Sequence, residues 1–152
     1  MIKDSHLEIV RTKGSKLGRV LMGLLFFVSG VGILMNGPAM TGAYFDSLGI
    51  PLAGLMAWLV MILKIVAGGA IMLGKRVTEA AAALIIFTLA ATLVAHMDFA
   101  DPMQLTQALK NLAIVGGLLY LMAFGPGGLD VKESGNAAPA APAPSSDGMS
   151  QM

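Results

Sequence analysis

Four apolar segments, each about as long as a membrane span, constrain this chain of 152 residues more than any other feature. They cover residues 17–35, 52–73, 77–95 and 102–124. A helix needs about 20 predominantly apolar residues to cross roughly 30 Å of hydrocarbon. A soluble helical bundle would instead require a polar face on every helix, and the stretch VLMGLLFFVSGVGILM has none. We therefore predict an all-α, integral membrane four-helix bundle.

Composition excludes several kinds of chemistry. The net charge of +1 gives no reason to expect a nucleic acid partner. The absence of cysteine excludes disulfides, thiolate metal sites and iron–sulfur clusters, and we predict no metal site. His6 and His96 fall on opposite sides of the predicted membrane topology, so they do not form a bis-histidine haem site. No catalytic motif occurs, and the sequence therefore predicts no activity for the chain on its own.

Lysine and arginine lie on one side of this topology. Outside the spans they occur only in an N-terminal arm, in the loop between the second and third spans, and at Lys132. The two other loops carry only acidic charges, at Asp46, Asp98 and Asp101. Because positive residues are retained on the cytoplasmic side, we predict that both termini are cytoplasmic.

The chain divides into three parts. A basic arm (residues 1–16) precedes the four-helix domain (17–130), and a tail follows it (131–152). The tail is rich in alanine, proline and serine and has no apolar face to bury, so we predict that it is disordered.

Polar residues of the spans recur at helical spacing and lie in the outer halves. Lys64 lies deepest, about 18 Å from the outer end of its helix at 1.5 Å per residue. A lysine at this depth costs about 2.5–3.5 kcal/mol on insertion scales and seldom persists without a partner or water. We predict a polar pocket that opens outward and has Lys64 at its floor. Its candidate residues are Lys64, Lys110, Asn111, His96, Thr88, Thr92, Ser29 and Asn36.

Alternative interpretations remain for several of these residues. Threonines in membrane helices often donate to the carbonyl four residues earlier, and Lys110 is shallow enough to reach the interface. No carboxylate lies near Lys64 along its span. Lys64 therefore meets carbonyls, hydroxyl or amide groups, water or an outside anion, or it is uncharged. Two lysines without an acid favour an anionic or strongly accepting ligand, such as a carboxylate or a quinone oxygen.

Several short motifs, in a fixed order, resemble one family. They are Arg19 at the start of the first span, SLGIP before the second, GGAIMLGKR at its end, His96 after the third, Lys110-Asn111 with AIVGGLL in the fourth, and GPGGLD after it. This pattern is similar to the DoxX family of small bacterial inner-membrane proteins. The resemblance implies a four-helix bundle in the inner membrane. It carries over to His96, Lys110, Asn111, Gly125, Pro126, Gly127 and Asp130.

The resemblance also implies a functional setting. Family members have been linked to respiratory quinol oxidation, thiosulfate–quinone oxidoreduction and oxidative-stress complexes, often as accessory subunits. An accessory, redox-associated subunit is thus the first hypothesis, with quinone as the compatible cofactor and other respiratory or membrane proteins, or a second copy, as partners. The alternatives are a small-solute transporter or channel with a polar outer vestibule, and a membrane scaffold or assembly factor.

This chain departs from the family pattern in two places. The family usually has an acidic residue in the middle of the second span, where this chain has Lys64. It also tends to have a lysine just after the first span, where this chain reads NGPAM. Lys64 therefore occupies the position of the family's intramembrane charge with the opposite sign.

Overall fold

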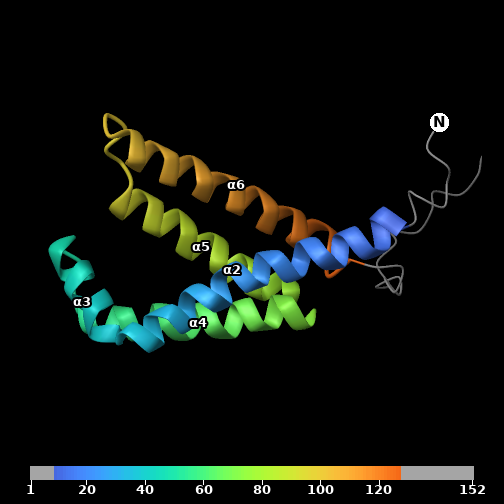
Figure 1. The fold of residues 1–152 in the computed structure, drawn as a ribbon, viewed down its shortest axis with the longest axis horizontal. Helices are drawn as coiled ribbons and strands as arrows, with labels where there is room; N and C mark the ends of the chain where they lie inside the picture. The colour runs from blue at the N-terminus through green and yellow to red at the C-terminus, as the bar shows by residue number, and fades with distance from the viewer. Residues whose placement is uncertain (1–8, 128–152) are drawn as a thin grey trace, which may run out of the picture.

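The computed structural model describes residues 9–127 of the chain; the predicted disordered tail and the first part of the basic arm lie outside the described residues. Every regular element in this range is helical, which confirms the predicted all-α class. A single π turn, η1 (Val10–Gly14), precedes five α-helices. These are α2 (Ser15–Asn36), α3 (Pro38–Ser47), α4 (Ala53–Leu73), α5 (Val77–Ala95) and α6 (Pro102–Phe124) (Figure 1).

Four of the helices are long and apolar enough to cross a membrane, as the sequence predicted. They are α4, α5, α6 and the first helix counted together with its π turn, Thr12–Asn36. The start of α2 and the end of α6 lie at the same end of the molecule (Figure 1). The described chain therefore begins and ends on one side of the bundle.

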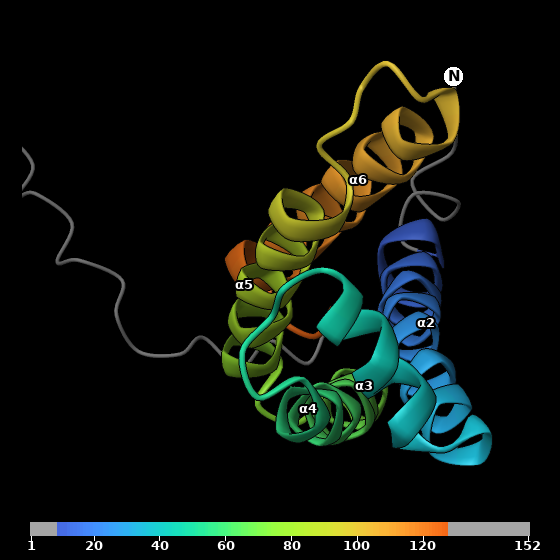
Figure 2. The ribbon, with the colours of Figure 1, turned by 90° about the vertical axis from the view of Figure 1, so that its left-hand side faces the viewer.

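The four long helices form two pairs that diverge. α2 packs along α4, α5 packs along α6, and α4 joins the pairs through a shorter contact with α5. α2 and α6 meet over only a small area. The pairs converge where α2 and α5 begin, and they separate toward α3 (Figures 1 and 2). We call these two ends the closed end and the open end.

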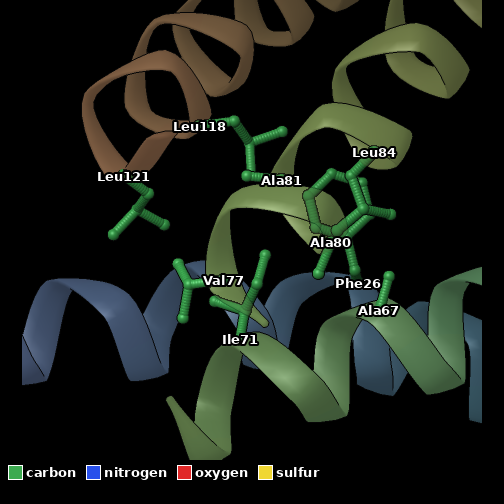
Figure 3. Packing of buried hydrophobic residues seen from close by; sticks show 9 residues of the cluster. All are labelled: Phe26, Ala67, Ile71, Val77, Ala80, Ala81, Leu84, Leu118 and Leu121. Atoms are coloured by element: carbon green, nitrogen blue, oxygen red, sulfur yellow. The ribbon is translucent and has the colours of Figure 1, made fainter. Parts of the chain in front are cut away.

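The buried core lies toward the closed end and draws on all four long helices (Figure 3). Its members are Phe26, Ala67, Ile71, Val77, Ala80, Ala81, Leu84, Leu118 and Leu121. Ile71, Leu84 and Leu118 are the largest side chains that are fully buried. Three small residues, Ala67, Ala80 and Ala81, lie among them. Small side chains allow helices to approach closely, which is the main source of packing energy between helices in lipid.

Glycines bring α2 and α4 into backbone contact. A Cβ built on Gly68 would lie 2.7 Å from the Phe27 nitrogen and 2.8 Å from the Gly23 oxygen. A Cβ on Gly23 would in turn lie 2.6 Å from the Gly68 oxygen. Because these neighbours are main-chain atoms, they cannot move aside as a side chain could. The α2–α4 seam therefore requires glycine at both positions.

Arg19 ties three chain segments together at the closed end. Its Nη1 donates to the Pro126 carbonyl at 2.9 Å, just beyond α6, and its Nη2 lies 3.5 Å from the Met72 carbonyl in the last turn of α4. The last carbonyls of a helix have no partner within the helix and carry partial negative charge. A guanidinium there stabilises the helix end while it links α2 to α4 and to the turn after α6.

The region between the first two spans contains a helix, α3, where the sequence analysis treated it as a loop. Pro38 occupies the first turn of α3, and Gly37 before it has φ +85. Gly42 lies against α4, where an added Cβ would be 3.3 Å from the Gly54 Cα. The Gly-Pro pair marks a break in the chain, but it also suits the start of a new helix. α3 also packs along α4, a contact that the sequence analysis did not predict.

Candidate functional site

A polar cavity of about 370 Å³ lies where the two helix pairs diverge. All four long helices contribute to it. Its lining residues are Leu25, Phe26, Ser29, Lys64, Phe87, Thr88, Ala91, His96, Gln107, Lys110, Asn111 and Ile114. Leu25, Phe26, Phe87 and Ile114 supply apolar surface among the polar groups, a mixture typical of ligand pockets, which are mostly apolar with a few placed polar groups.

Lys64 reaches from the middle of α4 across to α2. Its Nζ donates to the Ser29 hydroxyl at 3.0 Å and lies 5.0 Å from the centre of the Phe87 ring. The ring face is a favourable neighbour for a cation. Among residues 9–127, no carboxylate lies within ion-pair distance of this amine. Lys64 is thus held by one hydroxyl and one ring, and it retains donor capacity toward the cavity.

Two threonines of α5, Thr88 and Thr92, take part in a chain of hydrogen bonds that reaches α6. Thr88 donates to the Leu84 carbonyl and Thr92 donates to the Thr88 carbonyl, each at 2.7 Å. The Asn111 amide nitrogen then donates to the Thr92 hydroxyl at 2.9 Å. The threonine hydroxyl protons are therefore used within α5, as the packing interpretation of these residues expects. This chain of bonds fixes Asn111 at the cavity wall.

His96 is positioned where α5 ends. Its backbone nitrogen caps the helix by donating to the Thr92 carbonyl at 2.9 Å, and its Nδ1 lies 2.8 Å from the Gln104 side-chain oxygen. With that oxygen as the acceptor, Nδ1 carries the proton and, in the neutral ring, Nε2 remains an acceptor. The pair links the end of α5 to the first turns of α6.

A second, mostly apolar cavity of about 530 Å³ adjoins the first on the side of α3. The two cavities share four lining residues, Lys64, Phe87, Ala91 and His96. The remaining lining residues of the second cavity are Ile33, Thr41, Tyr44, Phe45, Leu48, Ile50, Met56, Val60, Ala90, Val94 and Ala95. A polar and an apolar cavity therefore lie side by side and are called below the polar half and the apolar half of the candidate site, and Lys64 lines both.

The structure brings most of the predicted site residues together. Lys64, Ser29, Thr88, His96, Lys110 and Asn111 line the polar cavity. Thr92 lies beside it and bonds to Asn111. Asn36, the exposed last residue of α2, lines neither of these two cavities. Helical spacing places Asn36 and Ser29 on one face of the same helix. It does not show that the two helix pairs separate at the depth of Asn36.

The candidate residues predicted from the sequence did not include most of the apolar lining residues, nor Gln107. Gln107 could have been included, because it lies one turn before Asn111 on the same face. Phe87 gave no signal among many apolar residues of its span. Tyr44 could not be predicted as a lining residue without knowledge of α3, which places it at the apolar cavity.

The arrangement presents hydrogen-bond donors that suit the binding of a ligand. Lys64, Lys110 and Asn111 present amine and amide donors to one cavity, and such donors complement carboxylate or carbonyl oxygens. Across the described range, no group of three histidine, aspartate or glutamate residues could hold a metal ion.

Four spanning helices around an internal polar cavity define a small polytopic integral membrane protein. A model of the DoxX family matches residues 14–97. Inner membrane protein YqjF of Escherichia coli (strain K12) is 35% identical over 118 residues, which covers 78% of this chain and 88% of that protein. This chain belongs to the DoxX family, and the resemblance seen in its sequence is confirmed. No solved structure gives a significant match.

Proposed function

We propose that this chain is an accessory subunit of a quinone-linked redox complex in the inner membrane, and that its polar cavity binds a quinone headgroup. The observation that carries the proposal is Lys64, which lies in mid-span with one hydroxyl partner and lines the cavity. A quinone carbonyl is an acceptor without charge, so it can enter an apolar environment more easily than a solvated anion. The family resemblance supports the redox setting.

Inner-membrane location and orientation are part of this proposal. The related YqjF is named as an inner membrane protein. Lys16, Arg19, Lys75 and Arg76 all lie at or near the closed end, whereas the loop before α6 carries Asp98 and Asp101. The positive-inside rule therefore makes the closed end cytoplasmic. A reporter fused after Lys132 should be active only in the cytoplasm, and a periplasmic signal at that site would reverse the orientation.

A quinone headgroup that lacks a hydrocarbon tail tests the quinone proposal directly. A dimethoxy-methyl-benzoquinone should raise the melting temperature of the purified chain in phosphatidylcholine nanodiscs. Lys64→Met should lose this protection, because the amine that contacts the carbonyl is gone. Lys75→Met is the matched control: Lys75 is exposed in the turn after α4, outside both cavities, and its removal should leave protection unchanged. Equal protection of all three proteins would exclude a headgroup site at Lys64.

Partners are tested separately. A mild-detergent pulldown of the full chain should retain a respiratory dehydrogenase or oxidase in stoichiometric amount. Recovery of the chain without such a protein, under conditions in which quinone still protects it, would leave a quinone-binding protein but remove the accessory-subunit role.

One observation favours a transporter as a second candidate. The polar cavity lies between pairs that are separated at one end, while Arg19 and the apolar core hold the other end together. A vestibule that is open to one side is the ground state that an alternating-access carrier requires. Flux of a small carboxylate into proteoliposomes, absent with Lys64→Met, would favour this candidate over the redox subunit.

A further inference from the structure

The polar and apolar cavities lie next to each other. They share Lys64, Phe87, Ala91 and His96 as lining residues. A ligand whose polar end contacts Lys64 therefore has an apolar space next to it, between α3, α4 and α5.

The apolar half has the lining and the volume expected of a site for a hydrocarbon chain. α3 and the turn after it contribute Tyr44, Phe45, Leu48 and Ile50, and the other walls come mainly from α4 and α5. Its volume of about 530 Å³ lies within the roughly 300–1,000 Å³ range of cavities that enclose a single small molecule. A cavity of this size suits one unbranched chain better than the two chains of a phospholipid.

The charge of the polar half selects the headgroup. Two primary amines, Lys64 and Lys110, line it, and neither is paired with a carboxylate within residues 9–127. The four acidic residues of that range, Asp46, Glu79, Asp98 and Asp101, line neither half of the site. Lys64 is half-buried and Lys110 is exposed at the cavity, and a ligand that supplies negative charge complements both amines. A carboxylate also accepts hydrogen bonds at both oxygens, so it can contact the Lys64 Nζ and the Ser29 hydroxyl together.

We propose that the two adjoining cavities together bind a single-chain, long-chain carboxylate, with its carboxylate at Lys64 and its hydrocarbon chain in the apolar cavity under α3. The inference rests on the proposed function only in taking the polar cavity as a ligand site. It differs in the chemistry of the ligand, which is anionic and requires the second cavity.

Four probes test this inference on the full chain in phosphatidylcholine nanodiscs. Palmitate should raise the melting temperature in a concentration-dependent way. Methyl palmitate, which keeps the chain and lacks the charge, and acetate, which keeps the charge and lacks the chain, should each have at least tenfold weaker effect. A two-chain anionic phosphatidate should also fail to protect. Equal protection by the ester or by phosphatidate would overturn the proposal. The protection would then depend only on the apolar chain or only on negative charge.

Two variants separate this inference from the quinone proposal. Ala90 lines only the apolar cavity, so Ala90→Phe should weaken palmitate protection at least tenfold and leave protection by the tail-less quinone intact. Ala113→Phe, on an exposed position of α6 outside both cavities, should change neither. Palmitate protection that survives Ala90→Phe would overturn the tail site. Palmitate protection without quinone protection would overturn the proposed function alone.

A labelling experiment avoids dependence on how well variants fold. Palmitate with a photoreactive diazirine near its chain end should label Phe45 or Met56, which are half-buried and line the apolar cavity from α3 and α4. Excess palmitate should prevent the labelling, and excess methyl palmitate should not. Labelling confined to exposed positions such as Leu21 and Leu119 would mean that the probe reads only the lipid-facing surface, and it would overturn the proposal.

Discussion

The same four helices are held together by different interactions at the closed end and at the open end of the molecule. At the closed end, the pairs meet through apolar side chains, many of them alanine and leucine, and Arg19 binds carbonyls in the last turn of α4 and just after α6. At the open end, polar groups form hydrogen bonds within a pair, as Lys64 does with Ser29 and Asn111 with Thr92. Among residues 9–127, the contact between the pairs at this end is that of the Lys64 amine with the Phe87 ring rather than a hydrogen bond. Packing therefore holds the closed end together. At the open end, hydrogen bonds within each pair hold the polar side chains in place, and the two pairs remain apart.

The largest effect should come from filling the α2–α4 seam. Gly68→Leu places a side chain where backbone atoms of α2 lie 2.7 and 2.8 Å from the Cβ position, so the two helices must separate. We expect loss of monodisperse protein after extraction, because overpacking that cannot be relieved exceeds the usual cost of about 1–3 kcal/mol. Gly116→Ala is the matched control, since nothing lies within 4 Å of its Cβ position. If both variants behave like the parent chain, glycine packing does not hold the closed end.

Removing Arg19 should weaken the same end by a smaller amount. Arg19→Met keeps the stem of the side chain but leaves the Pro126 and Met72 carbonyls without this donor. A hydrogen bond from a charged group contributes about 1.5–3 kcal/mol, so we expect a free energy of unfolding lower by about 2 kcal/mol. Chemical unfolding in detergent measures it, with Lys16→Met as a control on an exposed neighbour. An unchanged free energy would show that the clamp does not contribute to the closed end.

Substitution of Lys64 at the open end should raise the free energy of unfolding, whereas the two changes at the closed end should lower it. Lys64→Met removes a mid-span amine whose insertion costs about 2.5–3.5 kcal/mol and forfeits one charged hydrogen bond worth about 1.5–3 kcal/mol. The unliganded protein should therefore gain on the order of 1 kcal/mol. A cysteine at position 64, in a chain that has none of its own, should react with a small water-soluble thiol reagent and not with a lipid-phase one. The reverse labelling pattern would mean that this side chain faces lipid.

The smallest effect should follow loss of the bond between α5 and α6. Thr92→Val keeps the shape of the side chain and removes the hydroxyl that accepts from Asn111. Hydrogen bonds between membrane helices average about 0.6 kcal/mol, so the free energy of unfolding should fall by about that amount. Thr106→Val provides a control, because its hydroxyl donates only to the Pro102 carbonyl of its own helix. A loss above about 2 kcal/mol would mean that this bond, rather than packing, joins the pair.

The sequence predicted the spans well because segment length and apolarity depend on the bilayer rather than on neighbouring helices. It also grouped Lys64 with Ser29, since helical spacing and depth are local properties. It did not predict which glycines form seams: Gly68 lies against α2, whereas Gly32 and Gly116 have open space at their Cβ positions. The clamp by Arg19 and the cavity wall from Tyr44 depend on how distant segments pack, and no local pattern encodes that.

The short turn between α4 and α5 has a consequence for the order in which the chain is assembled. Gly74 and Arg76 adopt φ +71 and +49, and only three residues separate the two helices. Such a turn leaves α4 and α5 no alternative to lying antiparallel, so they can enter the bilayer as one helical hairpin during synthesis. The α2–α4 seam joins elements separated by α3, and it can form only after α4 has entered the bilayer. A defect at Gly68 would then appear after insertion, as helices that have crossed the membrane correctly but have not associated.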